Sequence, residues 1–295
     1  MRLIAELKDL SLIKNYQVDG WIVNIKNLSC YYDVDYQLEL EELKKIIEAI
    51  HNNNQKVYIN AKKIIHEENI TEIIDIIKKL ECLTVDYYFY SDVAFFEIAE
   101  ELNIKHKLIY QVNTYMTNSQ DIEIMISENS NVVISTEISK EEIVNIIKNI
   151  QKPLYLHSFG YYPIFHSRRE LITNYQKYRG IPLDINKNYD VVEELRNSHY
   201  PIEQNENGMV IYLDGAYYLS SEIVEFNKYN KDINYILTSK FVNLDEYKNV
   251  LDLYVAIKKE KSFSDEFEKL NLPLTKGLLY EKSTLLKKEG GAGCE

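Results

Sequence analysis

Short apolar runs alternate with amphipathic stretches along most of this chain. The runs typical of strands cover residues 3–7, 21–25, 57–60, 85–90, 108–112, 132–136, 154–157 and 235–239. Between them, apolar residues recur at three- and four-residue steps, as in Leu40, Leu43, Ile46, Ile47 and Ile50, and this spacing predicts helices. Further helices are predicted at 10–16 and 70–80, after Asp92, from about Ser119, from Ser139, and at 221–229 and 244–259.

This alternation predicts an α/β fold, and eight strand–helix units favour a TIM-like (β/α)8 barrel. The strands are continuously apolar, as is typical of strands covered on both faces. A doubly wound open sheet is the alternative, although no glycine-rich dinucleotide turn follows the first strand. The strand–helix alternation is interrupted at 200–219, where two runs of alternating apolar and polar residues flank Asn205–Gly208. They predict a β-hairpin inserted before the last βα unit. We therefore predict a barrel over residues 1–262 and an extension over 263–295 with a disordered tail.

Composition narrows the function classes. The net charge of −12, spread along the helices, disfavours a broad nucleic-acid or anionic-membrane surface but leaves room for a local basic pocket. The three cysteines are isolated, and no histidine pair has metal-ligand spacing, so no metal site is expected. No signal peptide or membrane span is apparent, which makes a cytoplasmic location the expectation.

One polar stretch stands out, the segment SFGYYPIFHSRRELITNY at residues 158–175. Ser167 followed by Glu170 has the spacing of a capping box at the start of a helix. Between them, Arg168 and Arg169 would face the positive end of the helix dipole, which costs stability unless an anion binds there. The segment thus predicts an anion site, and the alternative is that both arginines reach solvent or pair with nearby carboxylates.

In a barrel, functional side chains gather at the carboxyl ends of the strands. The catalytic candidates are Glu137, His157, His166 and Ser167, arranged as a Ser167–His166 or a His157–Glu137 relay. The candidates for substrate binding are Asn60, Gln111, Asn113, Thr117, Asn118, Tyr161, Arg168, Arg169, Asn174 and Tyr175. Helix capping is the competing explanation for Ser167, Thr117 and Asn118, and packing is the competing explanation for the tyrosines.

From Gly20 to about Lys287 the sequence resembles peptidase family U32, the collagenase-like proteases. The resemblance rests on LEELKKIIEAIHNNNQKVYINAKKIIHEENI, QVNTYMTNSQD, ISTEISKEEI, SFGYYPIFHSRRELITNY, YPIEQNENGMVIYLDGAYYL and GLLYEKSTLLKK in this order. It implies a TIM-like barrel and a reported peptidase activity, or a role in oxygen-independent hydroxylation of RNA bases, to which prephenate is linked. Many members of the family hold an iron–sulfur cluster on four cysteines. Here Pro163 and Glu170 stand at the first two positions and the later pair is missing, so neither a cluster nor another cofactor is expected.

Three hypotheses remain open. The first is a U32-type peptidase that acts on a peptide. The second is an RNA-modification protein that binds tRNA or rRNA and an anionic carboxylate, for which Arg168 and Arg169 would suit. The third is a non-catalytic barrel that pairs with a longer family paralogue, or with a second copy of itself.

Overall fold

A computed structural model describes residues 1–30, 34–128, 130–182, 184, 189–193, 198–205, 208–260 and 264–281. Eight parallel strands form a closed barrel, because the last of them, β13, pairs with both β1 and β7. They are β1 (Arg2–Glu6), β2 (Gly20–Asn24), β3 (Lys56–Ala61), β4 (Tyr87–Tyr90), β5 (Leu108–Tyr110), β6 (Asn131–Ile134), β7 (Leu154–Gly160) and β13 (Ile233–Leu237). The predicted (β/α)8 barrel is confirmed, with strand ends within a few residues of those expected.

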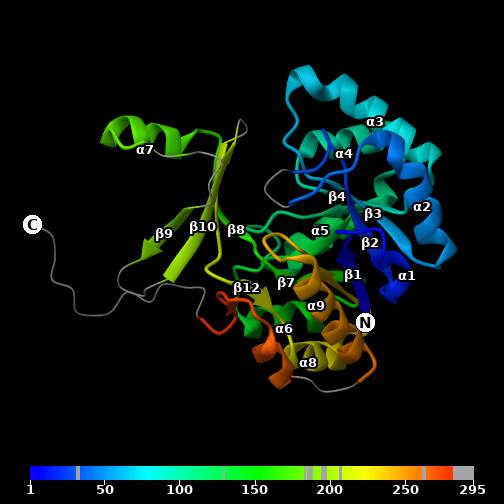
Figure 1. Cartoon of the computed structure of the whole chain (residues 1–295). Helices are drawn as coiled ribbons and strands as arrows, with labels where there is room; N and C mark the ends of the chain where they lie inside the picture. Colours follow the sequence, from blue (N-terminus) through cyan, green and yellow to red (C-terminus); the bar gives the residue numbers. More distant parts are fainter. Residues whose placement is uncertain are drawn as a thin grey trace, which may run out of the picture.

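Helices cover the outside of the barrel (Figure 1). They are α1 (Leu12–Asn15), α2 (Leu43–Asn52), α3 (Ile70–Cys82), α4 (Val93–Glu101), α5 (Ser119–Ser127), α6 (Lys140–Asn149), α8 (Ser221–Tyr229) and α9 (Leu244–Lys258). Single turns of 3-10 helix lie at Leu40–Glu42, Glu67–Asn69 and Lys105–Lys107. The expected caps are present on three of these helices: Asp92 accepts from the Ala94 amide, Asn118 from the Asp121 amide and Ser139 from the Glu142 amide.

The inside of the barrel is filled by a packed apolar core. One apolar side chain from each barrel strand contributes to a separate buried cluster, made of Ile4, Ile22, Tyr58, Phe89, Ile109, Val133, Tyr155 and Ile236. The larger cluster, between strands and helices, buries the other faces of the same strands. Both faces of each strand are therefore covered, which explains the continuously apolar strand sequences.

An insertion between β7 and β13 forms a second, antiparallel sheet beside the barrel (Figure 1). Its strands are β8 (Pro163–Ser167), β9 (Tyr189–Glu193), β10 (Ser198–Asn205) and β11 (Gly208–Tyr212), in the order β8-β11-β10-β9. The expected hairpin is the β10–β11 pair, which closes at Asn205 and Gly208. We call this unit the small sheet; β12 (Ala216–Tyr218) then pairs antiparallel with the end of β7.

The segment around Ser167 differs from the expectation. It is the end of strand β8, where Ser167 pairs with Met209, and its hydroxyl accepts from the Arg169 amide instead of capping a helix. The helix α7 (Leu171–Arg179) begins later, and its first free amides, of Ile172 and Thr173, donate to Gln204 Oε1 on β10. The capping-box prediction was therefore wrong, because cross-strand pairing and a cap distant in sequence outweighed the local motif.

The repeated strand–helix pattern suggests that a helix after the seventh strand covers the outside of the barrel. Helix α7 does not. It packs on the small sheet through Leu171 and Ile172, against Ile202 and Met209. In Figure 1 it lies at the end of that sheet farthest from β12, clear of the barrel helices.

Lys240 fastens the small sheet to the barrel. It follows β13, is only 4% exposed, and lies 2.9 Å from Glu203 Oε2 on β10 and 3.2 Å from Asp35 Oδ1 on the barrel rim. Its ammonium group also donates to the Val34 carbonyl oxygen. One buried cation thus holds the two units at a fixed separation.

The C-terminal segment returns to the barrel through the 3-10 helix η5 (Ser264–Lys269) and strand β14 (Leu274–Thr275), which pairs with β12. It is held by Glu222 of α8, a side chain 2% exposed that accepts from Lys276 Nζ at 2.9 Å and from the Tyr280 hydroxyl at 2.6 Å. The predicted disordered tail lies outside the described residues. Among the helices that the structure describes, none has the length and apolar character needed to cross a bilayer.

Candidate functional site

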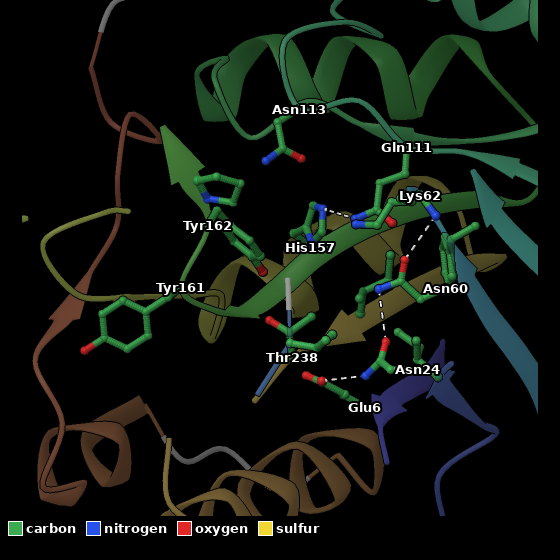
Figure 2. Close-up of a pocket in the computed structure, with 15 residues that line it drawn as sticks. Glu6, Asn24, Asn60, Lys62, Gln111, Asn113, His157, Tyr161, Tyr162 and Thr238 are labelled. Carbon is green, nitrogen blue, oxygen red and sulfur yellow. Dashed lines mark hydrogen bonds between the residues drawn. The ribbon is translucent and has the colours of Figure 1, made fainter. Parts of the chain in front are cut away.

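Polar side chains meet at the carboxyl ends of the barrel strands, where barrel enzymes place their sites. Figure 2 shows Glu6, Asn24, Asn60, Gln111 and His157 around one cavity, which we call the mouth cavity. Its volume of about 30 Å³ admits a water-sized group, since one water needs about 10–15 Å³ on this measure. Its further lining includes Lys62, Asn113, Tyr161, Tyr162, Pro163 and Thr238.

A ladder of hydrogen bonds crosses the ends of β1, β2 and β3. The Ser239 amide and hydroxyl donate to Glu6 Oε2, and Asn24 Nδ2 donates to Glu6 Oε1 at 2.8 Å. Asn60 Nδ2 in turn donates to Asn24 Oδ1 at 3.0 Å, and the Lys62 amide donates to Asn60 Oδ1. Burial raises the pKa of Glu6, and its bonds to Ser239 counteract that rise. Both oxygens of this carboxylate are occupied, so the ladder holds the rim rigid.

His157 is buried in the wall of the mouth cavity. Its Nε2 lies 2.9 Å from Gln111 Nε2, and its ring packs 4.3 Å, centroid to centroid, from that of Tyr162. Burial, with a smaller contribution from the Lys62 charge, lowers its pKa to about 3. His157 is therefore a neutral imidazole at physiological pH, and its partner is an amide where a catalytic relay would have a carboxylate.

Glu137 does not complete the His157–Glu137 relay. It follows β6, is exposed, and is not among the described residues that line the mouth cavity. The nearby Lys140 pairs with Glu225 at 2.7 Å. Partial burial raises the pKa of the Glu137 carboxyl, but the side chain stands apart from His157.

The second candidate relay lies on β8. Its two residues, His166 and Ser167, are neighbours in a strand, so their side chains point to opposite faces of the small sheet. Burial, with a contribution from Arg168, lowers the pKa of His166. The Ser167 hydroxyl is used by the Arg169 amide. The structure therefore does not bring the four catalytic candidates into one constellation.

The two arginines do not line the mouth cavity either, within the part of the chain that the structure describes. Arg169 is exposed between β8 and α7. Arg168 crosses to the barrel side, where its Nη2 lies 3.0 Å from His66 Nε2. The two arginines therefore do not share one pocket, because the chain after β8 directs Arg168 toward the β3–α3 loop; that they bind an anion stays a prediction.

Arg168 lines a second cleft, of about 560 Å³, between the small sheet and the barrel rim. Lys26 and Lys63 come from the loops after β2 and β3, His66 lies just beyond, and His166 comes from β8. We call these five residues the basic cleft. Lys26 is paired with Glu39 at 2.8 Å, Glu68 also lines the space, and Glu67 and Glu68 both lie beside Arg168. Lys63 and Arg168 are therefore the cations available to a ligand, and the nearby carboxylates offset part of their charge.

The basic cleft adjoins the mouth cavity. Lys62 lines the mouth cavity and the next residue, Lys63, lines the basic cleft. On β8, Pro163 lines the mouth cavity and His166 lines the basic cleft.

The predicted substrate-binding residues divide among several places. Asn60, Gln111, Asn113 and Tyr161 lie at the mouth cavity, and Asn118 caps α5 beside Thr117. Asn174 and Tyr175 lie on the exposed face of α7. Glu6, Lys62 and Thr238 also line the mouth cavity, but the sequence alone did not identify them as site residues. Only Glu6 could have been recognised, because a carboxylate inside the first apolar run is unusual.

A four-cysteine cluster does not fit the residues that are described. Pro163 lies in β8 and Glu170 is exposed before α7, whereas Cys30 is buried beside the basic cleft and Cys82 ends α3. No cluster of histidine, cysteine, aspartate or glutamate suited to a metal ion occurs in the described ranges.

The sequence is similar to those of several known proteins. A family model described as Peptidase family U32 matches residues 6–283. The "tRNA hydroxylation protein P2" of Bacillus subtilis is 27% identical over 174 residues, covering 57% of this chain and 56% of that protein. The "Uncharacterized protease MJ0090" of Methanocaldococcus jannaschii is 25% identical over 155 residues, covering 52% of this chain and 37% of that protein.

Among solved structures, "The Structure of the U32 Peptidase Mk0906" matches with a TM-score of 0.48 and 11% identity, over 81% of this chain and 93% of that one. The matched segments span about half the length of the first curated relative and about a third of the second.

Proposed function

The chain belongs to peptidase family U32, and from this premise we propose that it acts in tRNA modification, with the RNA backbone held in the basic cleft. The observation that carries the proposal is that Lys63 from the barrel rim and Arg168 from the insertion line the same cleft. In a chain of net charge −12, cations from two separate segments that meet in one cleft are a specific feature, because phosphate binding depends on clustered Lys and Arg. The name of the Bacillus subtilis relative also supports a role in tRNA modification.

Peptide hydrolysis is the weaker candidate for this chain. The second relative is named a protease, but the candidate groups here are dispersed: Ser167 on the small sheet, Glu137 on the rim and His157 beside an amide. A hydrolytic site needs a nucleophile and a base within hydrogen-bond reach. We expect purified protein and its Ser167→Ala variant to show equal, background activity on casein.

The proposal is tested by mass spectrometry of tRNA nucleosides from a deletion strain. We expect one hydroxylated nucleoside to disappear and its unmodified precursor, one oxygen lighter, to accumulate. The wild-type gene should restore it, and a Lys63→Gln, Arg168→Gln gene should restore it poorly at equal protein level.

The matched control replaces Lys44 and Lys45 with Gln, because both are exposed on α2, on the outside of the barrel. This variant loses the same charge and should complement fully. An unchanged nucleoside profile in the deletion strain would reject the proposal.

A further inference from the structure

Helix α7 presents two tyrosine rings to solvent. Tyr175 is 53% exposed and Tyr178 is 85% exposed, and their i, i+3 spacing places both rings on one face of the helix. Other tyrosines are exposed to a similar extent, namely Tyr36, Tyr115 and Tyr280, but they lie on separate segments. Two large rings on one helix face instead form a continuous apolar surface on which another ring can stack.

The same helix is basic, unlike the rest of the chain. Arg168 and Arg169 precede it and Lys177 and Arg179 end it, all four exposed, against the single carboxylate of Glu170. The whole chain carries a net charge of −12. Cations interleaved with exposed aromatic rings form the pattern that binds single-stranded nucleic acid, because charges follow the backbone while rings stack on the bases.

The scaffold holds this surface rigid. The inner face of α7 packs through Ile172 on Ile202 and Met209, and Gln204 Oε1 accepts from the first amides of the helix. Gln204 Nε2 also donates to Thr173 Oγ1 at 2.7 Å. A ring on a fixed helix loses little conformational entropy on binding, so stacking on it is efficient.

The helix also continues the basic cleft. Arg168 lines the cleft wall, and Leu171 begins α7 three residues later. Figure 1 shows α7 at the end of the small sheet, away from the barrel helices and with open space beyond it. An RNA strand leaving the cleft past Arg168 would come next to α7.

We propose that Tyr175, Lys177, Tyr178 and Arg179, the α7 arm, form a stacking platform for unpaired bases of an RNA whose neighbouring phosphates lie in the basic cleft. This deepens the proposed function and rests on it for the identity of the RNA. Sequence tolerance follows from the chemistry, because every base has a face on which a ring can stack.

The test measures fluorescence anisotropy of a labelled single-stranded RNA oligonucleotide and of the same sequence in a duplex. Tyr175→Leu with Tyr178→Leu should weaken single-strand binding at least tenfold and leave duplex binding nearly unchanged, because a duplex offers no free base faces. Tyr175→Phe with Tyr178→Phe keeps both rings and should bind like the wild type. Leucine is a good helix former at these exposed positions, so both doubles should keep the wild-type melting temperature.

Charge is tested separately from stacking. Lys177→Gln with Arg179→Gln should reduce the slope of log affinity against log salt by about 0.7 for each phosphate that the arm no longer neutralises. Lys44→Gln with Lys45→Gln is the control of equal charge and should leave the slope unchanged.

The outcomes separate this inference from the proposed function. If the leucine double binds single strands like the wild type while Lys63→Gln with Arg168→Gln does not, the α7 arm is rejected and the cleft proposal stands. If the leucine double instead alters the mass measured by light scattering, the face binds a second copy of the chain and the inference is overturned. If the arm variants behave as expected but the deletion strain keeps all its nucleosides, the arm binds RNA and the role in tRNA modification fails.

Discussion

Replacing Glu222 with Gln should destabilise the protein far more than the same change at Glu225, one turn along α8. The Glu222 carboxylate accepts from Lys276 Nζ, from the Tyr280 hydroxyl and from the Ser220 amide at 2.8 Å. Burial alone raises the pKa of Glu222, but the bonds from Tyr280, Ser220 and Lys276 outweigh it and lower the pKa to about 2.

The size of the pKa shift of Glu222 gives the expected loss of stability. From the ordinary value of 4.5 to about 2, at about 1.4 kcal/mol per unit, the carboxylate contributes roughly 3 kcal/mol at neutral pH. Burial lowers the pKa of Lys276, so the ammonium left alone in the variant can release its proton and limit the loss. We therefore expect about 2–3 kcal/mol, or roughly 4–12 °C in Tm for a chain of this size.

Thermal unfolding followed by circular dichroism measures the difference at pH 7. Glu225→Gln is the matched control: its pair with Lys140, 2.7 Å long, lies at the surface and should contribute no more than about 1 kcal/mol. Because the folded pKa of Glu222 lies below the unfolded value, its contribution is complete above about pH 4.5 and is lost as the pH falls toward 2. Equal Tm values for the two variants at pH 7 would refute the reasoning.

Three further predictions follow from buried contacts. Lys240→Met should lower the free energy of unfolding, measured by urea denaturation, by about 2–4 kcal/mol, because Glu203 and Asp35 lose their shared cation. Amide hydrogen exchange in the small sheet should become faster. Gln204→Leu should lower the free energy of unfolding by about 1 kcal/mol and speed amide hydrogen exchange only in the first turn of α7. Unchanged exchange in that turn would contradict the prediction. His157→Phe should flatten the pH dependence of stability: with a folded pKa of about 3, wild-type stability falls as the pH drops from 6.5 toward 3, because the unfolded chain takes up the proton first.

The barrel could be predicted from sequence because its determinants are local and repeated. Each strand is a continuous apolar run, each helix has a three- and four-residue stripe, and caps such as Ser139 with Glu142 lie within one turn. The mouth residues Asn60, Gln111 and His157 could be named for the same reason, because a strand end predicts its place in a barrel.

Beyond its local β10–β11 hairpin, the insertion could not be predicted in the same way, because its other determinants are distant in sequence. Ser167 and Glu170 match a capping box, yet Ser167 pairs with Met209 and the cap of α7 comes from Gln204. The position of Arg168 follows from β8, a strand with exposed Ile164 and Phe165 and no clear apolar alternation, so the sequence could not place this side chain.

The pairing of β7 with β13 has a consequence for how this molecule can change over time. The two strands run in register from Leu154 with Ile233 to His157 with Ile236, as if residues 161–232 were absent. Within this stretch α8 covers the barrel, but the register of closure places no demand on the sequence of the small sheet and α7. Ligand choice could diverge, or be re-engineered, through changes in the small sheet and α7 while the pairing of the barrel strands is kept.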